Sequence, residues 1–142
     1  MKPITSRITI EVMGSPKEHV EKALVDVINK LKNDKQIEVV NVKAYEAEQQ
    51  ENKLWSTFAD IEIETKNLKK LSDICYDYMP STLEILEPIG MEMQSIEVQD
   101  FINDVLTRMH KYAMVIRKLQ TENIYMMKEL EKVQGKKPKV IQ

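Results

Sequence analysis

Acidic side chains are the most numerous groups in this sequence that could do chemistry. Asp73 and Asp77 are four residues apart, a spacing that places both on one face of a helix. Glu84 and Glu87 bracket a short apolar segment farther along the chain. Carboxylate oxygens bind divalent cations, but no EF-hand-like loop is present and no His accompanies these acids. The sequence therefore predicts a solvated acidic face and no metal site.

The remaining reactive side chains are isolated from one another in the sequence. His19 and His110 have no Cys or His at ligand spacing, so both are expected on the solvated surface. Cys75 is the single cysteine, which excludes a disulfide or a cysteine-based zinc site within one chain and favours a small buried apolar role. No nucleophile, base pair or cofactor loop can be named, so we predict no catalytic residue, no cofactor and no enzyme activity.

One turn offers a candidate ligand site. The segment Met13-Gly14-Ser15-Pro16 links a predicted strand to a predicted helix, and it resembles the strand-to-helix turn where ACT domains bind small effectors at subunit interfaces. The resemblance covers residues 8–31, and the chain lacks both the Asp before that turn and the Gly after its Pro. It implies that the backbone of Gly14 and Ser15 would touch a ligand. The alternative is an ordinary helix start with Ser15 as the N-cap.

Alternation of apolar and polar residues predicts the scaffold that carries these side chains. Two helices with apolar faces are expected, one after Ser15 that ends near Asn33 and one over residues 67–79. The order strand, helix, strand, strand, helix, strand is the split βαβ or ferredoxin-like arrangement, an antiparallel sheet with both helices on one face. The sequence thus predicts an α+β ferredoxin-like domain over residues 7–88. Its strands are expected at residues 7–13, 37–46, 55–64 and 82–86.

The polar face of that sheet bears on nucleic-acid binding. RRM domains, which share this fold, present stacking aromatics with basic neighbours on their middle strands. Here Phe58 lies between Asp60 and Glu62, and acids repel phosphate. Any nucleic-acid contact would instead use the basic C-terminal segment, including Lys136, Lys137 and Lys139. A tail that only keeps the protein soluble is the alternative.

The C-terminal part of the chain predicts one long helix. Residues 89–94 form a connector, no residue from 95 to 134 breaks a helix, and residues 135–142 are expected to be a flexible basic tail. A helix of about 40 residues is roughly 60 Å long, more than a domain this small can cover. Apolar residues recur at alternating spacings of four and three, the seam of a coiled coil. The seam consists of Val98, Ile102, Val105, Met109, Tyr112, Ile116, Leu119, Asn123, Met126, Leu130 and Val133.

The seam predicts self-association. Asn123 falls at an a position, where a polar residue costs stability but fixes register, so it favours a parallel dimer. The e and g residues offer a parallel partner no complementary ion pair. Phe101, Leu106 and Val115 widen the apolar stripe, which suits burial against more than one neighbour. The alternative is a monomer whose long helix folds back along its own sheet.

Net charge changes sign along the chain. Residues 71–107 contain eight acids and no Lys or Arg, whereas residues 108–142 contain nine bases and three acids. Part of this pattern complements helix dipoles. The N-terminus lacks the apolar core of a signal peptide and no apolar run is long enough to span a membrane, so a cytoplasmic protein without membrane contact is expected.

Together these patterns predict a non-enzymatic assembly or scaffolding protein. Its first partner would be a second copy of the chain, with a dimer favoured and another protein partner as a further prediction. Two alternatives stay open: a small-molecule sensor of the ACT-like kind, and a nucleic-acid accessory protein that acts through its basic end.

Overall fold

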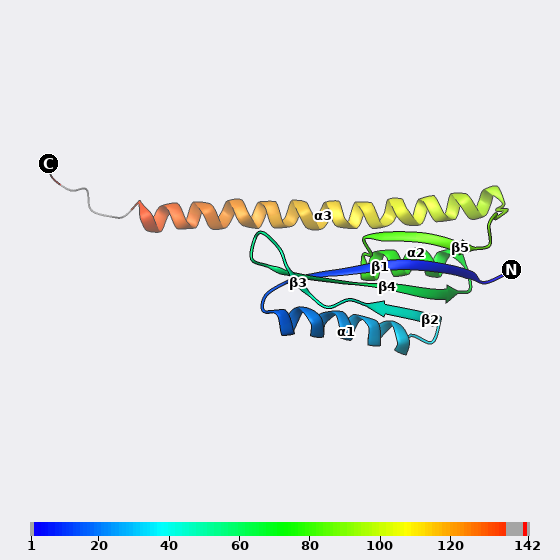
Figure 1. Ribbon diagram of the computed structural model, residues 1–142. Coiled ribbons are helices and arrows are strands. Elements are labelled where there is room, and N and C mark those ends of the chain that lie inside the picture. Colours follow the sequence, from blue (N-terminus) through cyan, green and yellow to red (C-terminus); the bar gives the residue numbers. More distant parts are fainter. Residues whose placement is uncertain (1, 136–140, 142) are drawn as a thin grey trace. The chain divides into compact units, whose positions relative to one another are not determined.

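The computed structural model describes residues 2–135 and 141, in two compact units that span Met1–Glu92 and Met93–Gln142. The first unit is a sheet with two helices and the second is dominated by a single long helix, α3 (Figure 1). The elements of the first unit are β1 (Ile4–Gly14), α1 (Lys17–Asn33), β2 (Ile37–Ala44), β3 (Glu48–Gln49), β4 (Trp55–Thr65), α2 (Leu68–Tyr78) and β5 (Thr82–Glu87).

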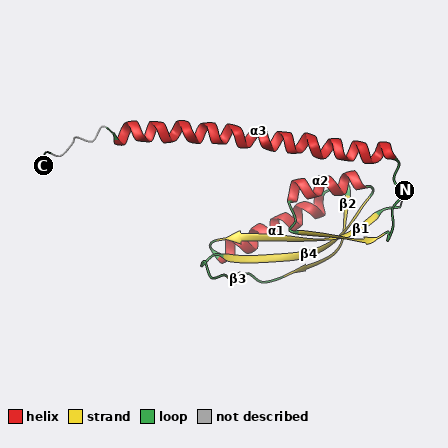
Figure 2. Cartoon of the chain, turned by 90° about the horizontal axis from the view of Figure 1, so that it is seen from above, coloured by secondary structure: helices red, strands yellow, loops and turns green. Residues whose placement is uncertain are grey.

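The sheet of the first unit is antiparallel throughout, with strand order β2-β4-β1-β5 and the short β3 paired with β4. β1 and β4 form its centre, where Ile8 lies opposite Ile61 and Ile10 opposite Ala59. Both helices lie on the same side of the sheet (Figure 2). The predicted α+β, ferredoxin-like fold with two helices on one face is confirmed.

A single apolar core joins both helices to one face of the sheet. Because side chains alternate along a strand, the residues at every second position of β1 and β4 point to this face. The apolar stripe of α1 and two residues of α2 complete the cluster, and each fully buried side chain of this size contributes about 1.5–3 kcal/mol. The central members are Ile8, Ile10, Leu24, Ile28, Leu31, Ala59, Ile61, Ile63, Leu71 and Ile74.

The ends of several elements differ from the sequence-based expectation. β1 begins at Ile4 rather than Arg7, since Ile4 and Ser6 continue the alternation and are buried. The prediction that Ser15 caps α1 is wrong: Pro16 is the N-cap residue, and its carbonyl accepts from the amides of His19 and Val20. Proline at this boundary leaves no side-chain oxygen to cap the helix.

The second helix begins and ends with recognisable caps. Asn67 Oδ1 accepts a hydrogen bond of 2.9 Å from the Lys70 amide at the start of α2. The helix stops at Met79, which adopts the left-handed conformation with φ 46° and ψ 57°, before Pro80. The side-chain cap that Asn67 provides at the start of the helix is of a kind that contributes about 1 kcal/mol to stability.

The second unit contains α3 (Ser95–Gln134), whose start is fixed by a capping box. The Gln94 side chain accepts from the third helical amide, and Glu97 Oε2 accepts from the Gln94 amide at 3.2 Å. The helix ends where the sequence predicts, with Gly135 as the C-cap residue. The rest of the predicted basic tail, 136–140 and 142, lies outside the described residues. In the part of the chain that is described, no helix is long and apolar enough to cross a membrane.

Candidate functional site

The apolar seam of α3 is the most extended candidate site. None of its eleven members is buried: Val105 is half-buried and the others are exposed. Met109, Leu119 and Leu130 are 57%, 56% and 58% exposed. Leu and Met side chains are more often buried in a protein core. The sequence prediction placed these residues on one line of the helix, and α3 is continuous through all of them.

Apolar side chains also lie outside the seam. Met114 is 67% exposed, and Ile124 and Tyr125 are 56% and 65% exposed. On either side of these residues, polar side chains form ion pairs within the helix: Arg108 Nε lies 3.3 Å from Asp104 Oδ2 and Lys132 Nζ lies 3.4 Å from Glu129 Oε1. Such pairs add a few tenths of a kcal/mol each to a helix.

The open face of the sheet is a second candidate surface. No helix of the first unit covers this side (Figure 2). Arg7 of β1 bridges the neighbouring strands, with Nη2 3.0 Å from Glu62 Oε1 and Nη1 3.3 Å from Glu84 Oε2. The hydrogen bond and the charge of Glu62 raise the pKa of the Arg7 guanidinium. Beside them Thr9 Oγ1 donates a hydrogen bond of 2.7 Å to Asp60 Oδ1. Three carboxylates of this face thus accept hydrogen bonds from Arg7 or Thr9.

Phe58 lies on this open face, as predicted, and has an aromatic neighbour that the sequence did not reveal. Tyr45 stacks on it with ring centroids 4.4 Å apart and an interplanar angle of 22°, and Lys43 Nζ lies 5.3 Å from the Tyr45 ring. The pairing of the Tyr45 amide with the Phe58 carbonyl creates this contact. The only signal in the sequence was that both predicted strands contain aromatic residues, Tyr45 in one and Trp55 and Phe58 in the other.

A family model describes both units of the chain together. The model of the MJ0538 family matches residues 5–139. The chain belongs to the MJ0538 family. No curated protein and no solved structure matched the chain. The match runs from β1 through α3, so it includes the long helix of this MJ0538-family protein.

The turn that resembles ACT domains joins β1 to α1 in the MJ0538-family chain. Gly14 is the last residue of β1 and pairs with Trp55 of β4. A Cβ on Gly14 would meet Val20 Cγ2 at 3.5 Å, an ordinary contact. Beyond the turn, Lys17 Nζ lies 2.6 Å from Glu46 Oε1 and 5.4 Å from the Trp55 ring. Ligand binding at Gly14 and Ser15 stays a prediction.

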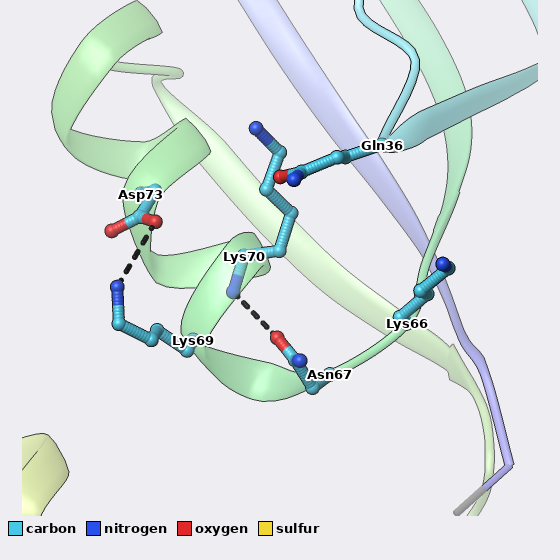
Figure 3. A pocket seen from close by; sticks show the side chains of 6 residues that line it. All are labelled: Gln36, Lys66, Asn67, Lys69, Lys70 and Asp73. Atoms are coloured by element: carbon cyan, nitrogen blue, oxygen red, sulfur yellow. Dashed lines mark hydrogen bonds and ion pairs between the residues drawn. The ribbon is translucent and has the colours of Figure 1, made fainter.

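A pocket of about 190 Å³ lies at the start of α2 (Figure 3). Lys66, Asn67, Lys69 and Lys70 line it, and a helix N-terminus with lysines suggests an anion site. However, Lys70 Nζ forms an ion pair of 2.9 Å with Asp34 Oδ2, and Lys69 Nζ lies 3.6 Å from Asp73 Oδ2. Asn67 already caps the helix. Two of the three lysines that line the pocket are therefore already paired with carboxylates.

The isolated reactive residues stay isolated in the fold. His19 and His110 are exposed, as predicted. Cys75 is half-buried rather than fully buried, because it lies at the edge of the core-facing stripe of α2, and burial raises the pKa of its thiol. Within residues 2–135 and 141, no three His, Cys, Asp or Glu side chains gather where they could hold a metal ion.

Proposed function

We propose that this MJ0538-family protein is a non-enzymatic assembly protein that self-associates through α3. One observation carries the proposal: eleven residues at coiled-coil spacing run along a 40-residue helix in which no residue is buried. A helix in water draws most of its stability from packing an apolar face, so this one needs a partner surface.

A second copy of the chain supplies such a surface without any other component. Burial of a side chain the size of Leu, Ile or Met contributes about 1.5–3 kcal/mol, and a pair of helices would bury several of them along the seam. The first unit contributes a folded head with its own core, which requires nothing from α3 to bury Ile8, Ile61 or Leu31. In this proposal the first unit folds around its own core, and α3 provides the surface for self-association.

The test is the mass of the full chain in solution, measured by light scattering during size exclusion and compared with a version that ends at Gln94. We expect a multiple of 16.6 kDa for the full chain and a monomer for the shorter version. A full-length monomer would overturn the proposal.

Two methionines of α3 provide a matched pair of variants. Met109 lies on the seam and Met114 on the opposite side, and they are 57% and 67% exposed. Met109→Lys should convert the oligomer to monomer, since it buries a charge at the interface, whereas Met114→Lys should leave the mass unchanged. Equal effects of the two substitutions would mean that the seam is not the interface.

A further inference from the structure

The charges of α3 change along its length, from an acidic start through a basic middle at residues 108–118 to an end of mixed charge. Residues 95–107 hold three acids and no Lys or Arg, whereas residues 108–134 hold six bases and three acids. When two fully overlapping helices run in the same direction, each of these segments lies beside its own copy. When one helix is reversed, the acidic start lies beside residues 121–133, which hold three acids and two bases, and the bases of residues 108–118 still lie beside each other. The net charge of the segments is therefore repulsive in both directions, and individual facing side chains decide between them.

We propose that two copies of α3 pair antiparallel, about a two-fold axis close to Met114. The inference rests on the proposed function, because it specifies how the two copies meet along the seam. When one helix is reversed, each a position faces a d position of the other copy, and almost the whole length of both helices overlaps. The facing pairs are Ile102 with Met126, Met109 with Leu119, Ile116 with Tyr112, Asn123 with Val105 and Leu130 with Val98.

The residues beside the seam support this direction. In an antiparallel pair each g position faces a g position, which puts Arg108 opposite Glu122 of the partner subunit and repeats the contact through the two-fold axis. In a parallel pair Arg108 would face Ala113 and Glu122 would face Met127. Charges at e and g set the direction of coiled coils, so the two ion pairs favour the antiparallel form.

The bulk and polarity of the seam residues are compatible with this pairing. A parallel pair would place two Tyr112 rings in one layer, whereas an antiparallel pair places each ring against Ile116. Asn123 favours the parallel form when it meets a second Asn123, but it costs stability in either direction.

Antiparallel pairing would separate the two points at which α3 joins the first unit. Ser95 of one copy would lie beside the end of the other helix, so the two junctions would be roughly 57 Å apart at 1.5 Å per residue. A parallel pair would hold both junctions at one end. The direction therefore decides whether the protein presents its two folded heads together or apart.

Distances between spin labels on the full chain test the direction. Met114 and Lys128 occupy the same outward heptad position, and Cys75, the only native cysteine, is replaced in a Cys75→Ala background. In the antiparallel form, labels at Met114→Cys lie at the same level along the axis, one on each outer side of the pair, whereas labels at Lys128→Cys are offset by about 42 Å along the axis. We expect a short distance for the first variant and a long one for the second.

The outcomes separate failure of this inference from failure of the proposed function. Equal label distances in a dimer would show parallel pairing and overturn the inference alone. Unequal distances that fit another offset would overturn the two-fold axis near Met114. A monomeric mass for the unlabelled Cys75→Ala protein and for the wild type would overturn the proposed function itself.

A charge exchange provides a second, independent measurement. Arg108→Glu should weaken dimerisation roughly tenfold at low salt, because it puts like charges opposite Glu122 of the partner subunit twice per dimer. The double variant Arg108→Glu with Glu122→Arg should restore the affinity. Arg108 also pairs with Asp104 in its own helix, and the double variant does not restore that contact. An absence of rescue would therefore overturn the proposed pairing.

Discussion

Lys70 Nζ lies 2.9 Å from Asp34 Oδ2, and this ion pair ties the start of α2 to the residue that follows α1. The hydrogen bond from Lys70 and another from the Gln36 amide hold the pKa of the Asp34 carboxyl below its usual value. A carboxyl with a lowered pKa in the folded state stabilises the fold above its unfolded-state pKa. That stabilisation is lost as pH falls through the folded-state pKa.

Lys70→Gln should lower the free energy of unfolding by about 0.5–1 kcal/mol at neutral pH. The difference from the wild type should begin to shrink as pH falls below the ordinary pKa of an unfolded-state Asp, about 4. It should disappear as pH falls through the lowered folded-state pKa of Asp34. Urea titrations over a pH series would measure it. Lys69→Gln is the control, since Lys69 is 76% exposed and 3.6 Å from Asp73. A loss for Lys70→Gln that does not change with pH would contradict this account of Asp34.

Ile61→Ala should destabilise the first unit by about 2–5 kcal/mol, because Ile61 is fully buried at the centre of the sheet and the substitution leaves a cavity. Ile85 on the edge strand β5 is 37% exposed, so Ile85→Ala should cost less than half as much. Urea unfolding of the two variants compares them directly. Equal losses would mean that β5 is packed more tightly than its exposure indicates.

Asn123→Val should raise the melting temperature of the oligomer, since a polar residue in the seam costs stability. In a parallel pair the substitution should also loosen the stoichiometry, because the register-fixing contact is lost. In the antiparallel pair the introduced valine would meet Val105 of the partner subunit, and the mass should stay the same. Asn103→Val, on an outward position of α3, is the matched control. Light scattering measures the mass and thermal melts measure the melting temperature, at equal protein concentration. If Asn123→Val changes neither quantity, Asn123 does not lie in the interface.

Met79→Gly should stabilise the first unit by about 0.5–1 kcal/mol. Met79 ends α2 with φ 46°, so its backbone is in the left-handed conformation, which glycine adopts without the steric cost of a Cβ, and its 77% exposed side chain contributes little packing. Met13→Gly, in the extended backbone of β1, should instead be destabilising. The urea midpoints of the two variants should move in opposite directions. A shift of both midpoints in the same direction would contradict the explanation from the left-handed backbone of Met79.

Local patterns predicted the elements whose side chains alternate or recur on one face. The buried residues of β1, β4 and α1 were expected because apolar side chains occupy every second position of the strands and one stripe of the helix. β3 escaped prediction, since Glu48 and Gln49 are polar and pair with β4 through the backbone alone.

Contacts between distant residues could not be predicted in the same way. The stacking of Tyr45 on Phe58 depends on the register of β2 with β4, and the ion pair of Lys70 with Asp34 joins residues 36 positions apart. The seam of α3 was visible because it lies within one helix, and its residues are placed there as expected. What the seam contacts depends on a second molecule and stays a prediction.

The open face of the sheet bears on how two copies approach each other. Glu11, Asp60, Glu62 and Glu64 lie on β1 and β4 at positions that alternate with the buried ones, while Arg7 is the basic residue among them. Two such faces repel each other over a range of about 8 Å at physiological ionic strength. Mutual repulsion of the sheets discourages stacking of the folded heads, even where assembly through another element brings them to high local concentration.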